Sequence, residues 1–153
     1  AELPGVRTLV APAGGGGLLG GVGIVSRALG PHVRVVGVQT EVTTALHDSL
    51  RAGELRSPPV VPTLCEGPSG DIDARSLALA RRVVDEVVLV TEEGVRRAIR
   101  HLYIEEGIVA EASAAVVAAA LLEERIPDLQ GPVAAVISGG NIDAPLLASI
   151  LSE

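Results

Sequence analysis

The sequence predicts an α/β protein built on a doubly wound, mostly parallel sheet in three layers (αβα). Strand-like apolar runs alternate with helix-like segments along the chain, which indicates parallel strands joined by helical crossovers. The apolar residues are mainly Val, Leu, Ile and Ala, with Tyr103 as the single aromatic, and branched aliphatics suit a sheet covered on both faces. The 153 residues, of which 48% are hydrophobic, match one domain spanning residues 1–153.

Glycine and proline punctuate the first third of the chain. Branched apolar runs predict buried strands, and a helical pattern follows each of them. These four elements are expected at residues 7–12, 18–29, 33–39 and 43–52. Three glycines inside the first helix, Gly20, Gly21 and Gly23, each cost about 1 kcal/mol relative to alanine. We therefore expect them to let this helix lie close against the sheet or a ligand.

An irregular connection is predicted at residues 54–73, where prolines and glycines exclude a long regular element. The alternation then resumes, with buried strands expected at 86–91 and 132–138. Thr91 is placed to cap the helix that follows it. Helices are expected at residues 74–84, 92–106, 112–125 and 144–151.

The charges and the single cysteine exclude several classes of protein. A net charge of −7 without a basic stripe argues against nucleic-acid binding, and no apolar run reaches the roughly 20 residues of a membrane-spanning helix. Cys65 alone cannot form an intramolecular disulfide, so we expect the cytoplasm. The charge of Glu66 raises the thiol pKa, so we expect no nucleophilic role. Spacing at i,i+4 predicts an exposed ion-paired face formed by Glu92, Glu93, Arg96, Arg97 and Arg100.

Four consecutive glycines between the first strand and the first helix form the stronger of two candidate sites. Backbone N–H groups at Gly14, Gly15, Gly16 and Gly17 can surround a small anion, and the positive end of the helix dipole points at the same place. This pattern predicts a phosphate-binding loop, with a flexible turn as the structural alternative. Because the chain has no lysine, the lysine-bearing phosphate loop of ATP-binding proteins is excluded, and we do not expect ATP chemistry.

The second candidate site is the tetrapeptide that follows the last strand, Ser138-Gly139-Gly140-Asn141. A hydroxyl at the end of a strand can donate a hydrogen bond to a ligand or accept one from it. A plain turn is the alternative. Together the two loops predict a flat, phosphorylated ligand held at both ends.

The chain resembles the pyridoxal-phosphate-dependent threonine and serine dehydratases, the family that includes serine racemase. The resemblance covers nearly the whole chain, and the SGGN loop separates it from cysteine synthases and cystathionine synthases. It implies the tryptophan synthase β-like fold of pyridoxal-phosphate enzymes (fold type II), incomplete here, with the chain as the C-terminal part of the large domain. The matching segments, in family order, are VAPAGGGGLLGGVGIVSRAL, VRVVGVQ, VVDEVVLVTEEGVRRAIR, GIVAEASAAVVAAAL and VAAVISGGNID.

The resemblance also implies roles for single residues. The serine of SGGN, Ser138, would hydrogen-bond the pyridine nitrogen, and Glu66 and Gly67 match an acidic residue and a glycine near the ring. Glu111 matches the glutamate of a family EGxGA segment, although a carboxylate that simply favours a helix start is an equal alternative. The cofactor phosphate would be bound by the backbone amides of Gly14, Gly15, Gly16, Gly17 and Leu18.

A departure from the family concerns a divalent cation that some relatives bind. They carry a glutamate where this chain has Gln39, use the backbone carbonyl at the position of Thr43, and carry an aspartate where it has Ala45. An amide and a methyl group replace two charged ligands, so we predict no metal there.

The catalytic lysine of the family, which binds the cofactor covalently, has no counterpart in this chain. We therefore expect no catalytic residue here, a missing N-terminal segment, and no activity of this chain alone. The whole protein is expected to be an ammonia-lyase that eliminates the β-hydroxyl of L-threonine or L-serine to give a 2-oxo acid, and to form homo-oligomers. The alternatives are a serine racemase or other β-eliminating enzyme, and a non-catalytic phosphate- or cofactor-binding module.

Overall fold

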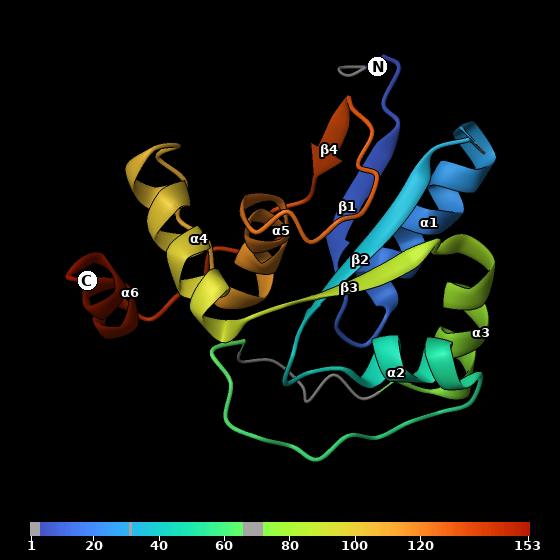
Figure 1. Cartoon of the computed structure of the whole chain (residues 1–153), viewed down its shortest axis with the longest axis horizontal. Helices are drawn as coiled ribbons and strands as arrows, with labels where there is room; N and C mark the ends of the chain where they lie inside the picture. The colour runs from blue at the N-terminus through green and yellow to red at the C-terminus, as the bar shows by residue number, and fades with distance from the viewer. Residues whose placement is uncertain (1–3, 31, 66–71) are drawn as a thin grey trace.

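The computed structural model describes residues 4–30, 32–65 and 72–153. Its centre is a four-stranded parallel sheet in the order β3-β2-β1-β4 (Figure 1). The register pairs Val10 of β1 with Val36 of β2 and with Ala135 of β4. The strands are β1 (Thr8–Pro12), β2 (Arg34–Thr40), β3 (Glu86–Val90) and β4 (Val133–Ala135).

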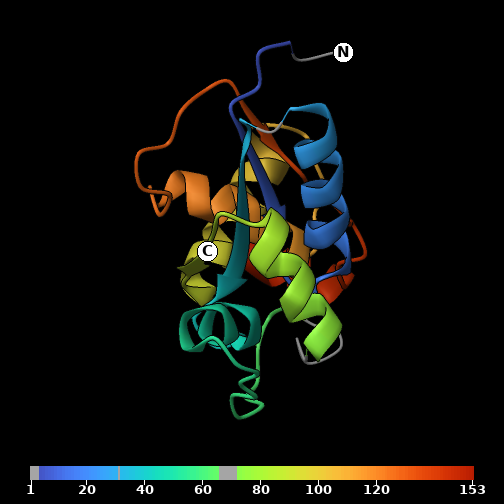
Figure 2. The same ribbon diagram turned by 90° about the vertical axis from the view of Figure 1, so that its right-hand side faces the viewer.

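Helices cover both faces of the sheet, which confirms the predicted doubly wound α/β architecture. One face carries α1 (Gly17–Leu29), α2 (Ala45–Ala52) and α3 (Ala74–Val83) (Figures 1 and 2). The other carries α4 (Glu92–Ile104), α5 (Ala112–Leu122) and α6 (Ala144–Leu151). Alternate residues of β2 serve the two cores, with Val35 facing the first layer and Val36 the second.

The alanine-rich α5 is apolar all round because it lies between the sheet and α4. Eight of its residues are buried, among them Ala115 and Val117, and it contacts β1, β2 and α4. Small side chains let α4 and the sheet approach it closely from both sides. None of the described helices is both long and apolar enough to cross a membrane.

The last strand differs from its prediction as a buried run over residues 132–138. Ladder pairing covers only Val133–Ala135, and Ala135 is exposed. The strand lies at the edge of the sheet, paired with β1 on one side and with no other strand in the described residues. The apolar run therefore predicted the presence of the strand correctly. Its burial is lower than predicted because the strand lies at the edge of the sheet.

The glycines of α1 differ from expectation in what they approach. A Cβ on Gly20 would lie 2.7 Å from Leu79 Cδ2, and one on Gly23 would lie 2.5 Å from Val83 Cγ2. Gly20 and Gly23 therefore let α1 pack closely against α3, and not against the sheet or a ligand. Gly21 is exposed. Gly37 in β2 lets α1 pack closely against the sheet, because a Cβ on Gly37 would lie 2.6 Å from Leu19 Cδ2.

The predicted ion-paired face of α4 is partly wrong. The Glu93 and Arg97 side chains pair at 3.6 Å, and the cap is confirmed, since Thr91 Oγ1 accepts from Gly94 N–H at 2.9 Å. Two arginines instead bind the end of the chain: Arg96 pairs with Glu153, and Arg100 Nη1 donates to the Leu151 carbonyl. Glu92 binds residues 63–64 instead of Arg96.

Candidate functional site

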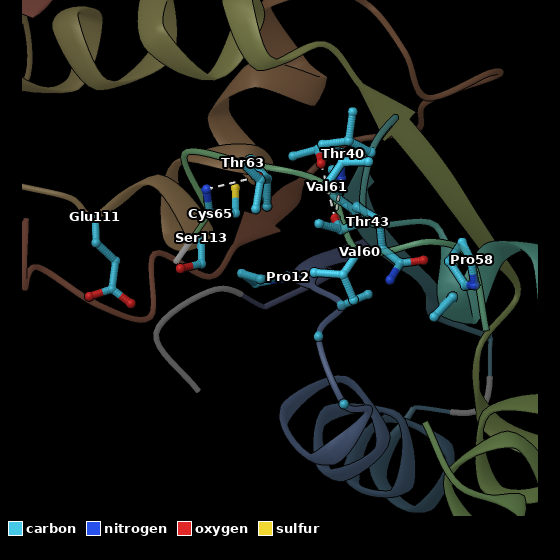
Figure 3. Close-up of a pocket in the computed structure, with 18 of the residues that line it drawn as sticks. Pro12, Thr40, Thr43, Pro58, Val60, Val61, Thr63, Cys65, Glu111 and Ser113 are labelled. Atoms are coloured by element: carbon cyan, nitrogen blue, oxygen red, sulfur yellow. Dashed lines mark hydrogen bonds between the residues drawn. The ribbon is translucent and has the colours of Figure 1, made fainter. Parts of the chain in front are cut away.

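A cavity of about 540 Å³ lies at the carboxyl ends of β1 and β2, where ligands bind in open parallel sheets. Its walls come from four parts of the chain: the loop after β1, the turn after β2, residues 58–65, and the start of α5. Figure 3 shows Glu111 and Ser113 at one end of the cavity and Val60 and Pro58 at the other.

The tetraglycine loop places open backbone donors at the start of α1. Gly14 and Gly15 line the cavity, and Gly16 is the N-cap with φ 91°, a left-handed conformation that favours glycine. No side chain caps the helix, and its first turn carries no acidic residue. The first intrahelical bond is Gly20 N–H to Gly16 C=O, 2.8 Å, so the preceding N–H groups, including that of Leu18, lack helical partners.

The surroundings of this loop fit a dianionic phosphate. A Cβ on Gly14 or Gly17 would meet nothing within 4 Å among residues 4–30, 32–65 and 72–153, so packing against these residues does not require glycine at either position. Gly14 lines the cavity, so a side chain there would take up space next to the start of α1. Three features together favour an anion: N–H groups without a partner in the part of the chain that the structure describes, the positive end of the helix dipole, and a first turn without acidic residues.

The SGGN loop is held against α5 by Glu111. The Asn141 N–H donates to Glu111 Oε2 at 3.0 Å, and the Glu111 N–H donates to the Gly139 carbonyl at 3.1 Å. A Cβ on Gly139 would lie 2.6 Å from the Glu111 carboxylate carbon. Ser138 is exposed and is not among the residues that line the cavity.

Glu111 occupies the N-cap position of α5, yet its side chain makes no cap hydrogen bond. The carboxylate accepts a hydrogen bond from the neighbouring loop instead. Both interpretations of Glu111, the family glutamate and the helix-start charge, stay predictions. The SGGN loop is thereby bonded to a residue of the cavity wall, because Glu111 lines the cavity.

Cys65 lines the cavity and is half-buried. Burial, with a smaller contribution from the negative charge of Glu92, raises the pKa of the Cys65 thiol to about 12. The predicted direction of the pKa shift is therefore confirmed with a different cause. Glu66 and Gly67 lie outside the described residues.

The carboxyl end of β2 carries a buried amide. Gln39 is 2% exposed, its Oε1 accepts from His47 N–H at 2.9 Å, and its Nε2 has no partner among the described residues. In the described ranges, no group of three or more His, Cys, Asp or Glu side chains could hold a metal ion. That no divalent cation binds here stays a prediction.

Sequence reasoning missed the wall formed by residues 58–63. Pro58, Pro59, Val60 and Val61 line the cavity from a connection without regular structure, and Val60 is 81% exposed. The available signal was the run PPVVP, whose valines lie among breakers and belong to no periodic element. Thr63 and Ser113 were missed because a single hydroxyl carries no pattern.

Comparison with known proteins defines the class. Residues 1–139 match the family described as pyridoxal-phosphate-dependent enzymes. The chain belongs to this family, and its sheet with flanking helices is part of the family's type II fold.

The sequence relatives that we compared include two L-threonine ammonia-lyases. The L-threonine ammonia-lyase of Geobacter sulfurreducens is 39% identical over 153 residues, covering 99% of this chain and 38% of that protein. The L-threonine ammonia-lyase of Thermotoga maritima is 40% identical over 157 residues, with the same coverage of 99% and 38%. The chain thus spans well under half the length of these relatives.

Solved structures agree with the sequence relatives. The threonine deaminase of T.th. superposes with a TM-score of 0.81 at 34% identity, covering 89% of this chain and 50% of that one. Serine racemase from Dictyostelium discoideum gives a TM-score of 0.84 at 28% identity, covering 93% and 46%.

Proposed function

We propose that this chain is the phosphate-binding part of a pyridoxal-phosphate-dependent ammonia-lyase acting on L-threonine or L-serine. The observation that carries the proposal is the uncapped start of α1 behind the tetraglycine loop, which opens on a cavity at the carboxyl edge of the sheet. The threonine ammonia-lyases that match 99% of the chain favour the same substrate class.

The residues of the first loop fit the cofactor phosphate, and we propose a partner for the ring nitrogen in the SGGN loop, although its Ser138 is exposed and does not line the cavity. The backbone N–H groups of residues 14–18 would hold the phosphate, since they lack side-chain acceptors and lie at the positive end of α1. The Ser138 hydroxyl would donate to the ring nitrogen and leave it without a proton of its own, because a hydroxyl is a far weaker acid than a carboxyl group. When bound, pyridoxal phosphate supplies an electron sink for negative charge at the α-carbon of an amino acid.

The chain would supply binding and orientation, and the covalent attachment would come from elsewhere. Covalent binding of the cofactor needs an amine side chain, and no lysine is present among the 153 residues. We propose that the lysine lies in the N-terminal part of the whole protein, and that the present chain alone is inactive.

A serine racemase is the second candidate, favoured by the superposition on the Dictyostelium enzyme. The experiment that separates the two uses the full-length protein loaded with pyridoxal phosphate. We expect release of 2-oxobutanoate from L-threonine and of pyruvate from L-serine. Formation of D-serine as the main product would favour the racemase, and failure to bind pyridoxal phosphate would contradict both.

A further inference from the structure

One carboxylate fixes three consecutive residues of the irregular connection. Glu92 Oε1 accepts from Thr63 Oγ1 at 2.7 Å, and Glu92 Oε2 accepts from Leu64 N–H at 2.7 Å. Thr63 Oγ1 in turn accepts from Cys65 N–H at 3.1 Å, as Figure 3 shows. The backbone of residues 64 and 65 is thus tied, directly or through one hydroxyl, to the first residue of α4.

These residues form part of the cavity wall. Thr63 and Cys65 line the cavity, and Leu64 and Cys65 pack against the core formed by α4 and α5. The residues that lead to them, 54–63, belong to no helix or strand. A segment without ladder or helical bonds owes its position to side-chain bonds and packing, so Glu92 is a principal determinant of where this wall lies.

The position of Glu92 suits a fixed charge. It lies in the first turn of α4, where the positive end of the helix dipole stabilises a carboxylate. A carboxylate also offers two acceptor oxygens, whereas the amide of glutamine offers one acceptor and one donor. Glutamine at residue 92 could accept from Leu64 N–H with its oxygen, but it could bond Thr63 only by reversing the direction of that hydrogen bond. It would also lose the charge that strengthens both bonds.

We propose that Glu92 is a positioning residue that holds residues 63–65 in place as a preformed wall of the cofactor cavity, and thereby raises affinity for pyridoxal phosphate. The inference rests on the proposed function of the cavity. Because the wall is already ordered before the ligand binds, binding does not lose the conformational entropy of these residues, and the affinity is higher. Loosening it lowers the fraction of molecules that are ready to bind.

The test compares Glu92→Gln with Glu93→Gln in the full-length protein. The two substitutions remove the same charge from the same helical turn, but Glu93 is exposed and pairs only with Arg97 among the described residues. Titration with pyridoxal phosphate should show an affinity about tenfold weaker for Glu92→Gln, the equivalent of about 1.4 kcal/mol. The affinity of Glu93→Gln should stay within about twofold of wild type.

Cys65 provides a second readout that is independent of activity. The thiol is protonated at neutral pH because burial and the charge of Glu92 raise its pKa, and only the thiolate attacks alkylating reagents at an appreciable rate. In Glu92→Gln the segment loosens and the charge disappears, so iodoacetamide should label Cys65 faster at a given pH than in Glu93→Gln. Pyridoxal phosphate should protect Cys65 in the wild-type protein, as judged by mass spectrometry of the peptide that contains it.

Thr63→Val covers the case in which Glu92→Gln does not fold. It removes the hydroxyl but keeps the bond from Leu64 N–H to Glu92, so a loss of affinity of about threefold is expected. A merely structural role would lower the melting temperature of Glu92→Gln and leave cofactor affinity unchanged. Equal cofactor affinity in wild type, Glu92→Gln and Thr63→Val would overturn this proposal alone, whereas a wild-type protein that binds no pyridoxal phosphate would overturn the proposed function as well.

Discussion

The loops after β1 and β4 are both glycine-rich, yet their glycines serve opposite purposes. After β1, a Cβ on Gly14 or Gly17 would meet no described residue within 4 Å, whereas one on Gly16 would lie 3.1 Å from Ser76 Cβ. At Gly14 and Gly17 the missing side chains therefore leave open space. After β4, a Cβ on Gly139 would lie 2.6 Å from the Glu111 carboxylate carbon, and one on Gly140 would lie 2.9 Å from the Val109 carbonyl oxygen. There the space is already filled by the chain itself. A glycine run indicates a ligand only where the fold leaves the vacated space open.

The largest expected effect follows from placing a negative charge in the first loop. In the full-length protein, Gly14→Asp should weaken pyridoxal phosphate binding about a hundredfold or more, because a carboxylate would compete with the phosphate for the same N–H donors. Titration followed by cofactor absorbance measures the change.

The matched control is Gly21→Asp, on the exposed side of α1 where a Cβ also meets nothing within 4 Å. It adds the same charge to the same helix away from the cavity and should leave the cofactor affinity nearly unchanged. Equal losses of cofactor affinity in Gly14→Asp and Gly21→Asp would show that the loop after β1 is no more important for phosphate binding than the rest of α1.

In the loop after β4, the expected effect is on stability. Gly139→Ala should lower the free energy of unfolding by about 1 kcal/mol, because the new methyl group displaces the Glu111 carboxylate and breaks its hydrogen bond to Asn141 N–H. Urea unfolding of the full-length protein measures it. The double variant Gly139→Ala with Glu111→Ala should lose less than the sum of the single changes, and strict additivity would show that Glu111 is not the obstacle.

A smaller effect on stability is expected at Gly17, in the loop after β1. Gly17→Ala should raise the free energy of unfolding of the full-length apoprotein by about 0.5 kcal/mol, since alanine favours the first turn of α1 and meets no neighbour. The same substitution should weaken pyridoxal phosphate binding by about threefold because the methyl group lies at the helix end. Destabilisation measured by urea unfolding would mean that the loop after β1 is packed as tightly as the loop after β4.

The smallest expected effect concerns the carboxyl end of β2, where Gln39 is buried. We predict that Mg²⁺ and Ca²⁺ do not bind near Gln39 with micromolar affinity, because a neutral amide replaces a charged ligand. Adding either ion should leave the affinity for pyridoxal phosphate unchanged, as measured by calorimetry with and without the ion. Binding of either ion would contradict this prediction. It would add a positive charge beside the cavity, so the start of α1 would no longer be the sole source of attraction proposed for the phosphate.

Local patterns predicted most of the fold. Capping and periodicity placed α4 behind Thr91 and gave α6 its observed bounds, and strand runs predicted all four strands. The predicted burial of β4 was wrong because burial depends on which strand lies beside it. The predicted roles of Gly20 and Gly23 were wrong because their neighbours on α3 are more than fifty residues away in sequence.

The candidate site was predicted less completely. Glycine spacing located the loop after β1 because phosphate binding there uses the backbone, which leaves a signature in sequence. The bond between Glu92 and Thr63 joins residues 29 positions apart, and Glu92 also satisfies the i,i+4 pattern with Arg96. A local rule therefore assigned it the wrong partner. Contacts between a loop and a helix cap carry no periodicity and require the folded chain.

The most direct test compares pyridoxal phosphate with pyridoxal, which lacks the phosphate, in the full-length protein and in Gly14→Asp. If the start of α1 binds the phosphate, the wild-type protein should prefer pyridoxal phosphate by about a hundredfold or more, and Gly14→Asp should lose most of that preference. A wild-type protein that binds both compounds equally, or a preference that survives in Gly14→Asp, would contradict the assignment of this loop to the phosphate.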